Sequence, residues 1–308
     1  MGPVQAGLSD AHLPQACSFH MPSGMPLQPS PLTQQSLQPR PVGGLDAYRS
    51  GEVTAVGEGV DDLSPGARVA CLSTIGAFAE ELIVPATACF PLPAAVSFET
   101  AAILPVGYGT AWHALHDRGN TQPGETVLVL GAAGGVSLAA VQIAKALGAR
   151  VIAAASSERK LAVCCAYGAH ATIDYTTEDL RAAIDRHTAG KGADVIVDTV
   201  GGSQSEPAFR SIARRGRHLV VGFAAGTIPA LPWNLPLLKV AAIVGVYWGD
   251  CVRYEPVRAR EQMSALTAAV ADGKVAPIVS GRHPLERLQE ALARVSARAV
   301  IGKRIVLI

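Results

Sequence analysis

The chain has 308 residues, of which 49% are hydrophobic, so it holds enough apolar side chains to fill the cores of two ordinary domains. Its formal net charge is only +1, which argues against a nucleic-acid partner that would have to be bound through its phosphates. It lacks a basic start followed by a short apolar run and any stretch of about 18 apolar residues, so we expect a soluble, cytoplasmic protein with no membrane partner.

Residues 1 to about 44 are rich in proline, glutamine and serine and hold hardly any charged side chains. The segment has little periodic apolar content with which to offset the entropy lost on ordering. We therefore expect residues 1–50 to be an atypical and largely irregular N-terminal segment. A proline-rich docking tail is the functional alternative.

From Gly51 onward the pattern changes to short β-type runs separated by Gly, Asp and Pro turns, namely GEVTAVGEGV, ARVACL and AFAEELIVP. These runs predict several strands of a small barrel or sandwich. The next stretch, SFETAAILPVGYGTAWHAL, predicts a helix with Ser97 as its N-cap and Thr100 three residues later. Pro105 and Gly107 interrupt this helix, so we expect a kink that exposes backbone near its centre.

Between Glu125 and about Gly249, apolar runs alternate with helical patterns. The predicted strands cover residues 126–131, 151–155, 194–198, 218–222 and 242–246. The predicted helices cover residues 135–148, 157–167, 178–188 and 204–214. Strands rich in Val, Ile and Ala with intervening helices predict a doubly wound parallel sheet that is covered on both faces.

The end of the chain contains two helical runs, RAREQMSALTAAVADGK and PLERLQEALARVSA, and a last strand, KRIVLI. We expect these elements to return to the first domain or to cover an edge of the sheet. The six cysteines form no C-x-x-C pair and no Cys/His set with the spacing of a zinc site, so free thiols and no metal are expected. Cys164 and Cys165 lie in a helical pattern that points their side chains about 100° apart, which argues against a disulfide.

A glycine-rich turn follows the first strand of the alternating region, in VLVLGAAGGVSLAAVQIAKALGA. In a nucleotide-binding turn, three small residues allow the tight turn, the approach of a pyrophosphate, and close packing of helix on strand. Ala132, Gly134 and Ser137 occupy these positions. Because the turn joins a strand to a helix, it predicts dinucleotide binding, with bare helix packing as the alternative. Ser137 is expected to loosen the turn without abolishing it.

The second strand of this region ends in AAASSERK, without the Asp or Glu that binds the ribose 2′-hydroxyl in NAD sites. Ser156 takes that place, and Arg159 and Lys160 follow. A carboxylate would repel a 2′-phosphate, whereas hydroxyls and cations accept it. The missing acid therefore predicts NADPH, with Lys160 on the phosphate. The alternative is a pair of solvated cations on a helix face.

Six stretches in a fixed order resemble a known family: LSPGARVACL, LPVGYGTAWHAL, GETVLVLGAAGGVSLAAVQIAKALGARVIAAASSERK, GKGADVIVDTVGG, LVVGFAAG and LLKVAAIVGVYWG. From about Gly51 to its end, the chain resembles the zinc-independent quinone oxidoreductases, the zeta-crystallin-like branch of the medium-chain dehydrogenase/reductase superfamily. The resemblance implies an α/β fold with a Rossmann doubly wound parallel sheet over residues 123–249. It also implies a partial GroES-like β-rich domain over residues 51–122 and 250–308.

The resemblance further implies NADPH in the cleft between these domains and a homodimer that forms by pairing of sheet edges. It assigns the pyrophosphate to Gly134, Gly135 and Val136. It assigns the 2′-phosphate region to Ser156, Lys160 and Tyr175. It assigns the nicotinamide end to Thr110, Gly222, Phe223 and Ala224. Ordinary sheet packing is the alternative for Tyr175, and a place in the core is the alternative for Phe223.

The N-terminal segment departs from the family pattern, which begins with opening strands and an Asn-x-x-Asp stretch that lines the active site. The first asparagine here is Asn120. The substrate domain is therefore expected to lack part of its wall, and no catalytic residue is assigned. The zinc-dependent relatives use a cysteine, a histidine-glutamate pair and a four-cysteine lobe, for which we find no counterpart. His113 and His116 are expected at an interface or on the surface.

These features favour an NADPH-dependent oxidoreductase that reduces quinones or α,β-unsaturated carbonyls by hydride transfer without zinc. A non-enzymatic or inactive NADPH-binding protein is one alternative, because of the unusual N-terminal segment. A second is an enoyl-thioester reductase of the same superfamily, for which Arg253, Arg258 and Arg260 could bind the coenzyme phosphates. A third is a methyltransferase with a Rossmann-like sheet, which Lys160 and the missing acid argue against.

Overall fold

A computed structural model describes residues 16–20, 48–73, 75–296 and 302–308. Most of the segment that was predicted to be irregular lies outside these residues. Two of its parts are described: Ala16–His20 forms strand β1, and strand β2 begins at Tyr48.

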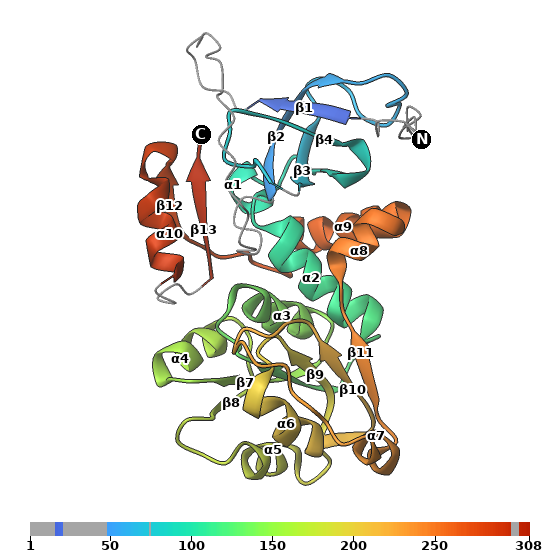
Figure 1. Cartoon of the computed structure of the whole chain (residues 1–308), viewed down its shortest axis with the longest axis vertical. Helices are drawn as coiled ribbons and strands as arrows, with labels where there is room; N and C mark the ends of the chain where they lie inside the picture. The colour runs from blue at the N-terminus through green and yellow to red at the C-terminus, as the bar shows by residue number, and fades with distance from the viewer. Residues whose placement is uncertain (1–15, 21–47, 74, 297–301) are drawn as a thin grey trace, which may run out of the picture.

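The larger sheet has six parallel strands in the order β11-β10-β9-β6-β7-β8 (Figure 1). They are β6 (Thr126–Leu130), β7 (Arg150–Ala155), β8 (Ala171–Asp174), β9 (Ala193–Asp198), β10 (Ile212–Val220) and β11 (Ala242–Gly245). This order confirms the predicted doubly wound sheet. The chain adds β7 and β8 on one side of β6, and then β9, β10 and β11 on the other side, so the winding reverses between β6 and β9. Ligands of such sheets bind at that reversal, outside the carboxyl ends of the strands.

Helices cover both faces of this sheet because successive residues of its strands point to opposite sides. Val127 and Val129 of β6 belong to a core with α3 (Gly135–Ala146) and α4 (Glu158–Ala166). Leu128 and Leu130 belong to a second core with α5 (Leu180–Thr188) and α6 (Ser205–Arg210).

A second, antiparallel sheet has five strands in the order β4-β1-β2-β3-β5 and lies at the top of Figure 1. They are β1 (Ala16–His20), β2 (Tyr48–Val56), β3 (Arg68–Leu72), β4 (Glu81–Pro85) and β5 (Cys89–Pro91). Its own small core includes Val53, Val69 and Val84. This sheet fits the predicted GroES-like part.

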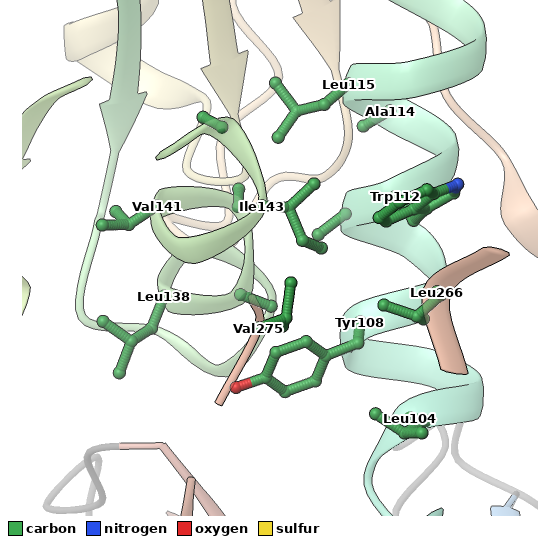
Figure 2. Close-up of a cluster of buried hydrophobic side chains, with 14 of the residues drawn as sticks. Leu104, Tyr108, Trp112, Ala114, Leu115, Leu138, Val141, Ile143, Leu266 and Val275 are labelled. Atoms are coloured by element: carbon green, nitrogen blue, oxygen red, sulfur yellow. The ribbon is translucent and has the colours of Figure 1, made fainter. Parts of the chain in front are cut away.

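The interrupted helix between the two sheets is α1 (Phe98–Ala101), the π-helical turn Leu104–Tyr108, α2 (Gly109–Trp112) and the π-helical turn His113–Arg118. Ser97 caps it as predicted, since its Oγ accepts a hydrogen bond from the N–H of Thr100 at 3.2 Å. At the interruption, Nε1 of Trp248 donates a hydrogen bond to the carbonyl oxygen of Pro105 at 2.7 Å. Figure 2 shows side chains of this helix, such as Leu115, packed toward α3.

The C-terminal part contains α8 (Trp248–Tyr254), α9 (Pro256–Ala271) and α10 (Leu288–Ser296). Strand β12 (Val279–Pro284) pairs in parallel with the predicted last strand, β13 (Lys303–Leu307). Figure 1 shows α10 and these two strands as a separate group beside the antiparallel sheet. No helix within the described ranges is long and apolar enough to cross a membrane.

The predicted helix over residues 204–214 is wrong in its last part, because α6 ends at Arg210 and β10 begins at Ile212. Ile212 pairs with Ala193, and the pairing resumes only at Arg217 after a shift in register. Arg215 has a φ of 66°, which a helix does not allow. Strands β8 and β12, and helices α7 (Asn234–Lys239) and α8, were not predicted.

Asp198, the last residue of β9, organises the carboxyl end of the sheet. It is 3% exposed and accepts hydrogen bonds from the N–H groups of Val200 and Gly201, from Ser205 Oγ and from His218 Nε2, at 2.5–3.1 Å. Burial alone would raise the pKa of Asp198, but the bonds from His218, Gly201 and Ser205 hold it below its usual value.

Replacing Asp198 with Ala leaves these buried donors without an acceptor and should lower the free energy of unfolding at pH 7 by about 3–5 kcal/mol. Because the folded pKa lies below the unfolded one, the carboxylate stabilises the fold above about pH 4, and this contribution is lost as the pH falls further. Asp198→Asn should therefore approach the wild type in stability toward low pH. Urea unfolding at pH 7 and at lower pH measures the loss in Asp198→Ala and the pH dependence of Asp198→Asn. Asp272→Asn, at the exposed Asp272–Lys274 pair, is the control. An unchanged stability of Asp198→Ala would contradict this role.

Candidate nucleotide-binding site

The glycine turn follows the carboxyl end of β6, next to the carboxyl end of its neighbour β9. Gly131 has a φ of 60°, and a Cβ at this position would lie 2.5 Å from Cγ2 of Val200. Both the backbone angle and the neighbour therefore require glycine. The N–H of Gly134 donates to the carbonyl of Gly131 at 2.9 Å and closes the turn before α3 begins.

Ser137, at the predicted third position of the turn, is 1% exposed. Its Oγ lies 3.2 Å from the carbonyl oxygen of Leu130 and 2.7 Å from Oγ1 of Thr199. Contrary to the expectation that this hydroxyl loosens the turn, it joins α3 to the ends of β6 and β9. A glycine at position 137 could not make these bonds.

The predicted pyrophosphate residues form the start of α3. Gly134 is exposed, whereas Gly135 and Val136 are half-buried. The first N–H groups of a helix have no acceptor within the helix, and the helix dipole favours a negative charge beside them. The close turn and these N–H groups together fit a phosphate group.

The predicted 2′-phosphate residues meet at the end of β7. Lys160 Nζ donates a hydrogen bond to Ser156 Oγ at 2.9 Å, which places an ammonium and a hydroxyl together. Arg159 is exposed. The N–H of Tyr175 donates to the carbonyl of Ala155 at 3.2 Å, so this residue lies next to the same strand end. Its ring packs against the second core, as the alternative for Tyr175 expected.

The predicted nicotinamide loop is held to the end of β9 by backbone bonds. The N–H groups of Val221 and Gly222 reach the carbonyl of Asp198, and that of Ala224 reaches the carbonyl of Thr199. Phe223 is 40% exposed, so its alternative as a core residue is wrong.

Thr110, which was also assigned to the nicotinamide end of the cofactor, is half-buried in α2. The described contacts do not join it to the loop. Instead, Gly222 and Phe223 line a pocket with His113, one helical turn after Thr110.

His113 is buried where the interrupted helix meets α9. Its Nδ1 lies 3.0 Å from Oδ2 of Asp117 and 3.1 Å from Oε1 of Gln262, and burial lowers its pKa. His116 is exposed and stacks on Trp112. The exposed position of His116 agrees with the predicted surface location, whereas His113 is buried inside the chain. Within the described residues, no three His, Cys, Asp or Glu side chains come together as metal ligands.

The three arginines considered for coenzyme phosphates have other contacts. Arg258 forms ion pairs with Asp117 and Glu255, and Arg260 forms one with Asp62. Arg253 lies over the ring of Tyr254. A coenzyme phosphate would therefore compete with carboxylates for two of these three side chains.

Sequence analysis did not identify a pocket of about 270 Å³ that borders the start of α3. Gly135 lines it together with Tyr48, Phe78 and Lys303, which come from distant parts of the chain. Lys303 Nζ donates to the hydroxyl of Tyr48 at 3.1 Å. Lys303 belongs to the predicted last strand, and nothing in the pattern of that strand indicates that it approaches the glycine turn.

The chain is similar to known dehydrogenases and quinone oxidoreductases. A family model described as zinc-binding dehydrogenase matches residues 135–269. The quinone oxidoreductase-like protein 2 homolog of Nematostella vectensis is 40% identical over 260 residues, which cover 83% of this chain and 71% of that protein. The quinone oxidoreductase of Pseudomonas syringae has a TM-score of 0.80 at 29% identity, covering 99% of this chain and 94% of the other.

A further structure is that of the Escherichia coli quinone oxidoreductase complexed with NADPH. It has a TM-score of 0.78 at 29% identity and covers 86% of this chain and 82% of the other.

The role of Ser137 can be tested by a double-mutant cycle with Thr199. Ser137→Ala and Thr199→Val should each lower the free energy of unfolding by about 1 kcal/mol, because each removes a buried hydrogen bond. The double variant should lose less than the sum, since both substitutions break the same bond. Urea unfolding gives the three values, with the exposed Ser264→Ala as the control. Additive losses, or a gain in stability for Ser137→Gly, would show that the Ser137 hydroxyl does not stabilise the turn through Thr199.

Proposed function

This chain belongs to the quinone oxidoreductase-like branch of the medium-chain dehydrogenase/reductase superfamily, and on that premise we propose that it is an NADPH-dependent oxidoreductase that reduces quinones or α,β-unsaturated carbonyls without zinc. The observation that carries the cofactor part is the contact of Lys160 with Ser156 at the end of β7. A hydroxyl and a cation stand where a carboxylate would select NAD.

In this proposal each part of the site has a separate task. The turn from Gly131 to Gly135 holds the pyrophosphate, and Lys160 with Ser156 binds the 2′-phosphate. The loop 222–224 positions the nicotinamide end through its bonds to β9. The bound cofactor supplies the hydride, so the chain contributes orientation and exclusion of water. We assign no side chain as the proton donor.

The enoyl-thioester reductase alternative receives less support from the described side chains. An enoyl-thioester reductase would need free cations for the coenzyme phosphates, whereas Arg258 and Arg260 already pair with carboxylates. An inactive cofactor-binding protein shares the same nucleotide site. It differs only in turnover, which the experiment below measures.

The function is tested by NADPH oxidation at 340 nm with 1,2- and 1,4-quinones and enones, together with fluorescence titration of NADPH and NADH. Lys160→Ala should weaken NADPH binding by about tenfold or more and leave NADH binding nearly unchanged, because only NADPH carries the 2′-phosphate. The exposed neighbour Arg159→Ala should change neither. Binding without turnover would indicate an inactive protein, and equal losses for both cofactors would contradict the role of Lys160.

We also propose that the chain forms a homodimer through β11, which is one of the two edge strands of the larger sheet. Large apolar side chains are exposed on this strand and on the segments that precede and follow it, namely Trp233, Leu237, Leu238, Ile243 and Tyr247. An open strand edge beside an exposed apolar surface can pair with a second copy.

Sedimentation velocity should show a dimer for the wild type. Ile243→Lys should shift it to the monomer, because a lysine on the edge disfavours pairing. Val257→Lys, at an equally apolar exposed position on α9, should leave the dimer intact. A monomeric wild type at micromolar concentration would contradict the proposal.

A further inference from the structure

His113 and Asp117 form a buried pair on the interrupted helix, and α9 holds both side chains in place. Nδ1 of His113 lies 3.0 Å from Oδ2 of Asp117 and 3.1 Å from Oε1 of Gln262. Gln262 Nε2 donates to Asp117 at 3.0 Å, so the amide oxygen is the atom left for the ring. Because both neighbours of Nδ1 are acceptors, this nitrogen carries the ring hydrogen. The pair therefore fixes both the tautomer and the orientation of the imidazole.

The other ring nitrogen of His113, Nε2, has no hydrogen-bond partner in the ranges that the structure describes. The residue is only 5% exposed, and its ring packs against Trp248 with the ring centres 5.6 Å apart. The same residue lines a pocket of about 610 Å³ together with Gly222 and Phe223. A buried polar atom without a partner costs free energy. Nε2 is therefore available to a polar group that enters this pocket.

This pocket lies next to the region that the proposed function assigns to the nicotinamide. The loop of that region contributes Gly222 and Phe223 to the wall of the pocket. Thr110, assigned to the same end, precedes His113 by one helical turn. Phe223 is 40% exposed and offers an aromatic surface to a planar ring. Arg118 also lines the pocket, and its Nε donates to the last carbonyl of β11 at 3.1 Å.

We propose that His113 is the proton donor of the reduction and that Asp117 positions its imidazole. This inference rests on the proposed function, which leaves the proton donor open. A quinone or enone that takes up the hydride becomes an oxyanion, and Nε2 of the imidazolium gives its proton to that anion. One hydride and one proton then complete the two-electron reduction, and the imidazole regains its proton from water. Arg118 stabilises the oxyanion before the proton arrives.

The charged groups around His113 determine how the reaction depends on pH. Burial lowers the pKa of His113, while its hydrogen bond to Gln262 and the charge of Asp117 raise it. The nearby cations Arg118 and Arg258 lower the pKa of His113 further. The proton donor is lost as the pH rises through this pKa, so kcat should fall above it. The other titratable side chains that line the pocket are Tyr247, Asp250, Cys251 and Glu255.

The test compares His113→Asn with His116→Asn, an exposed control on the same helix. Asparagine keeps a donor for Asp117 but has no group in the place of Nε2. With quinone and NADPH at saturation, His113→Asn should lower kcat by about 100-fold and abolish its fall at higher pH. Fluorescence titration should show that His113→Asn binds NADPH as tightly as the wild type. His116→Asn should match the wild type in both measurements.

The positioning role of Asp117 is tested by Asp117→Asn. A neutral side chain no longer favours the imidazolium, so the fall of kcat should move to lower pH. A merely structural role of Asp117 would lower the amount of folded protein and leave the pH profile of the remaining activity unchanged. The same profile in Asp117→Asn and the wild type would therefore contradict the positioning role.

A second measurement uses the unmodified chain with isotope-labelled histidine and does not depend on the folding of a variant. A hydroquinone added together with NADP⁺ should shift the NMR signal of His113 Nε2, because its hydroxyl donates to that nitrogen, and should leave His116 unchanged. An unchanged pH profile in His113→Asn, or a His113 signal that does not respond, would overturn this inference while leaving the proposed function standing. A wild type that oxidises no NADPH with any quinone or enone would instead overturn the proposed function itself.

Discussion

The close approach of β6 and β9 at their carboxyl ends is the constraint on which the rest of the site depends. It leaves no room for a Cβ at Gly131, because Val200 of the next strand end lies 2.5 Å from that position. The chain must therefore turn tightly and enter α3 at once. Ser137 then fixes the helix to both strands through Leu130 and Thr199.

The other parts of the site lie next to this turn, at the carboxyl ends of the neighbouring strands. Asp198 ends β9, and its side chain binds the turn that contains Val200. Its carbonyl accepts a hydrogen bond from the N–H of Gly222, at the start of the loop 222–224. β7 lies on the other side of β6, and at its carboxyl end Ser156 and Lys160 are in contact. Three groups with different chemistry, the helix start, the cation with its hydroxyl, and the loop, therefore border the carboxyl end of one sheet. This is the arrangement expected for a dinucleotide, whose parts differ in charge and polarity.

The parts of this fold that sequence analysis predicted are those set by local pattern. Continuous apolar runs marked β6, β7 and β9 because these strands are buried on both faces. β8 has a single buried residue and gave no such signal. The Lys160–Ser156 contact spans one helical turn and could be predicted, whereas Lys303 meets Gly135 only through the tertiary fold. The bonds of Ser137 were missed for the same reason, since its partner Thr199 follows another strand, β9.

The central claim is that a nicotinamide dinucleotide binds across the carboxyl end of the sheet, with its 2′-phosphate on Lys160. Hydrogen–deuterium exchange with and without saturating NADPH tests this most directly, because it reports where the backbone is protected. The account predicts slower exchange in peptides that cover residues 131–137, 156–160 and 222–224, and no change in α5. Protection confined to other parts of the chain, or none at a concentration that gives measurable binding, would contradict it.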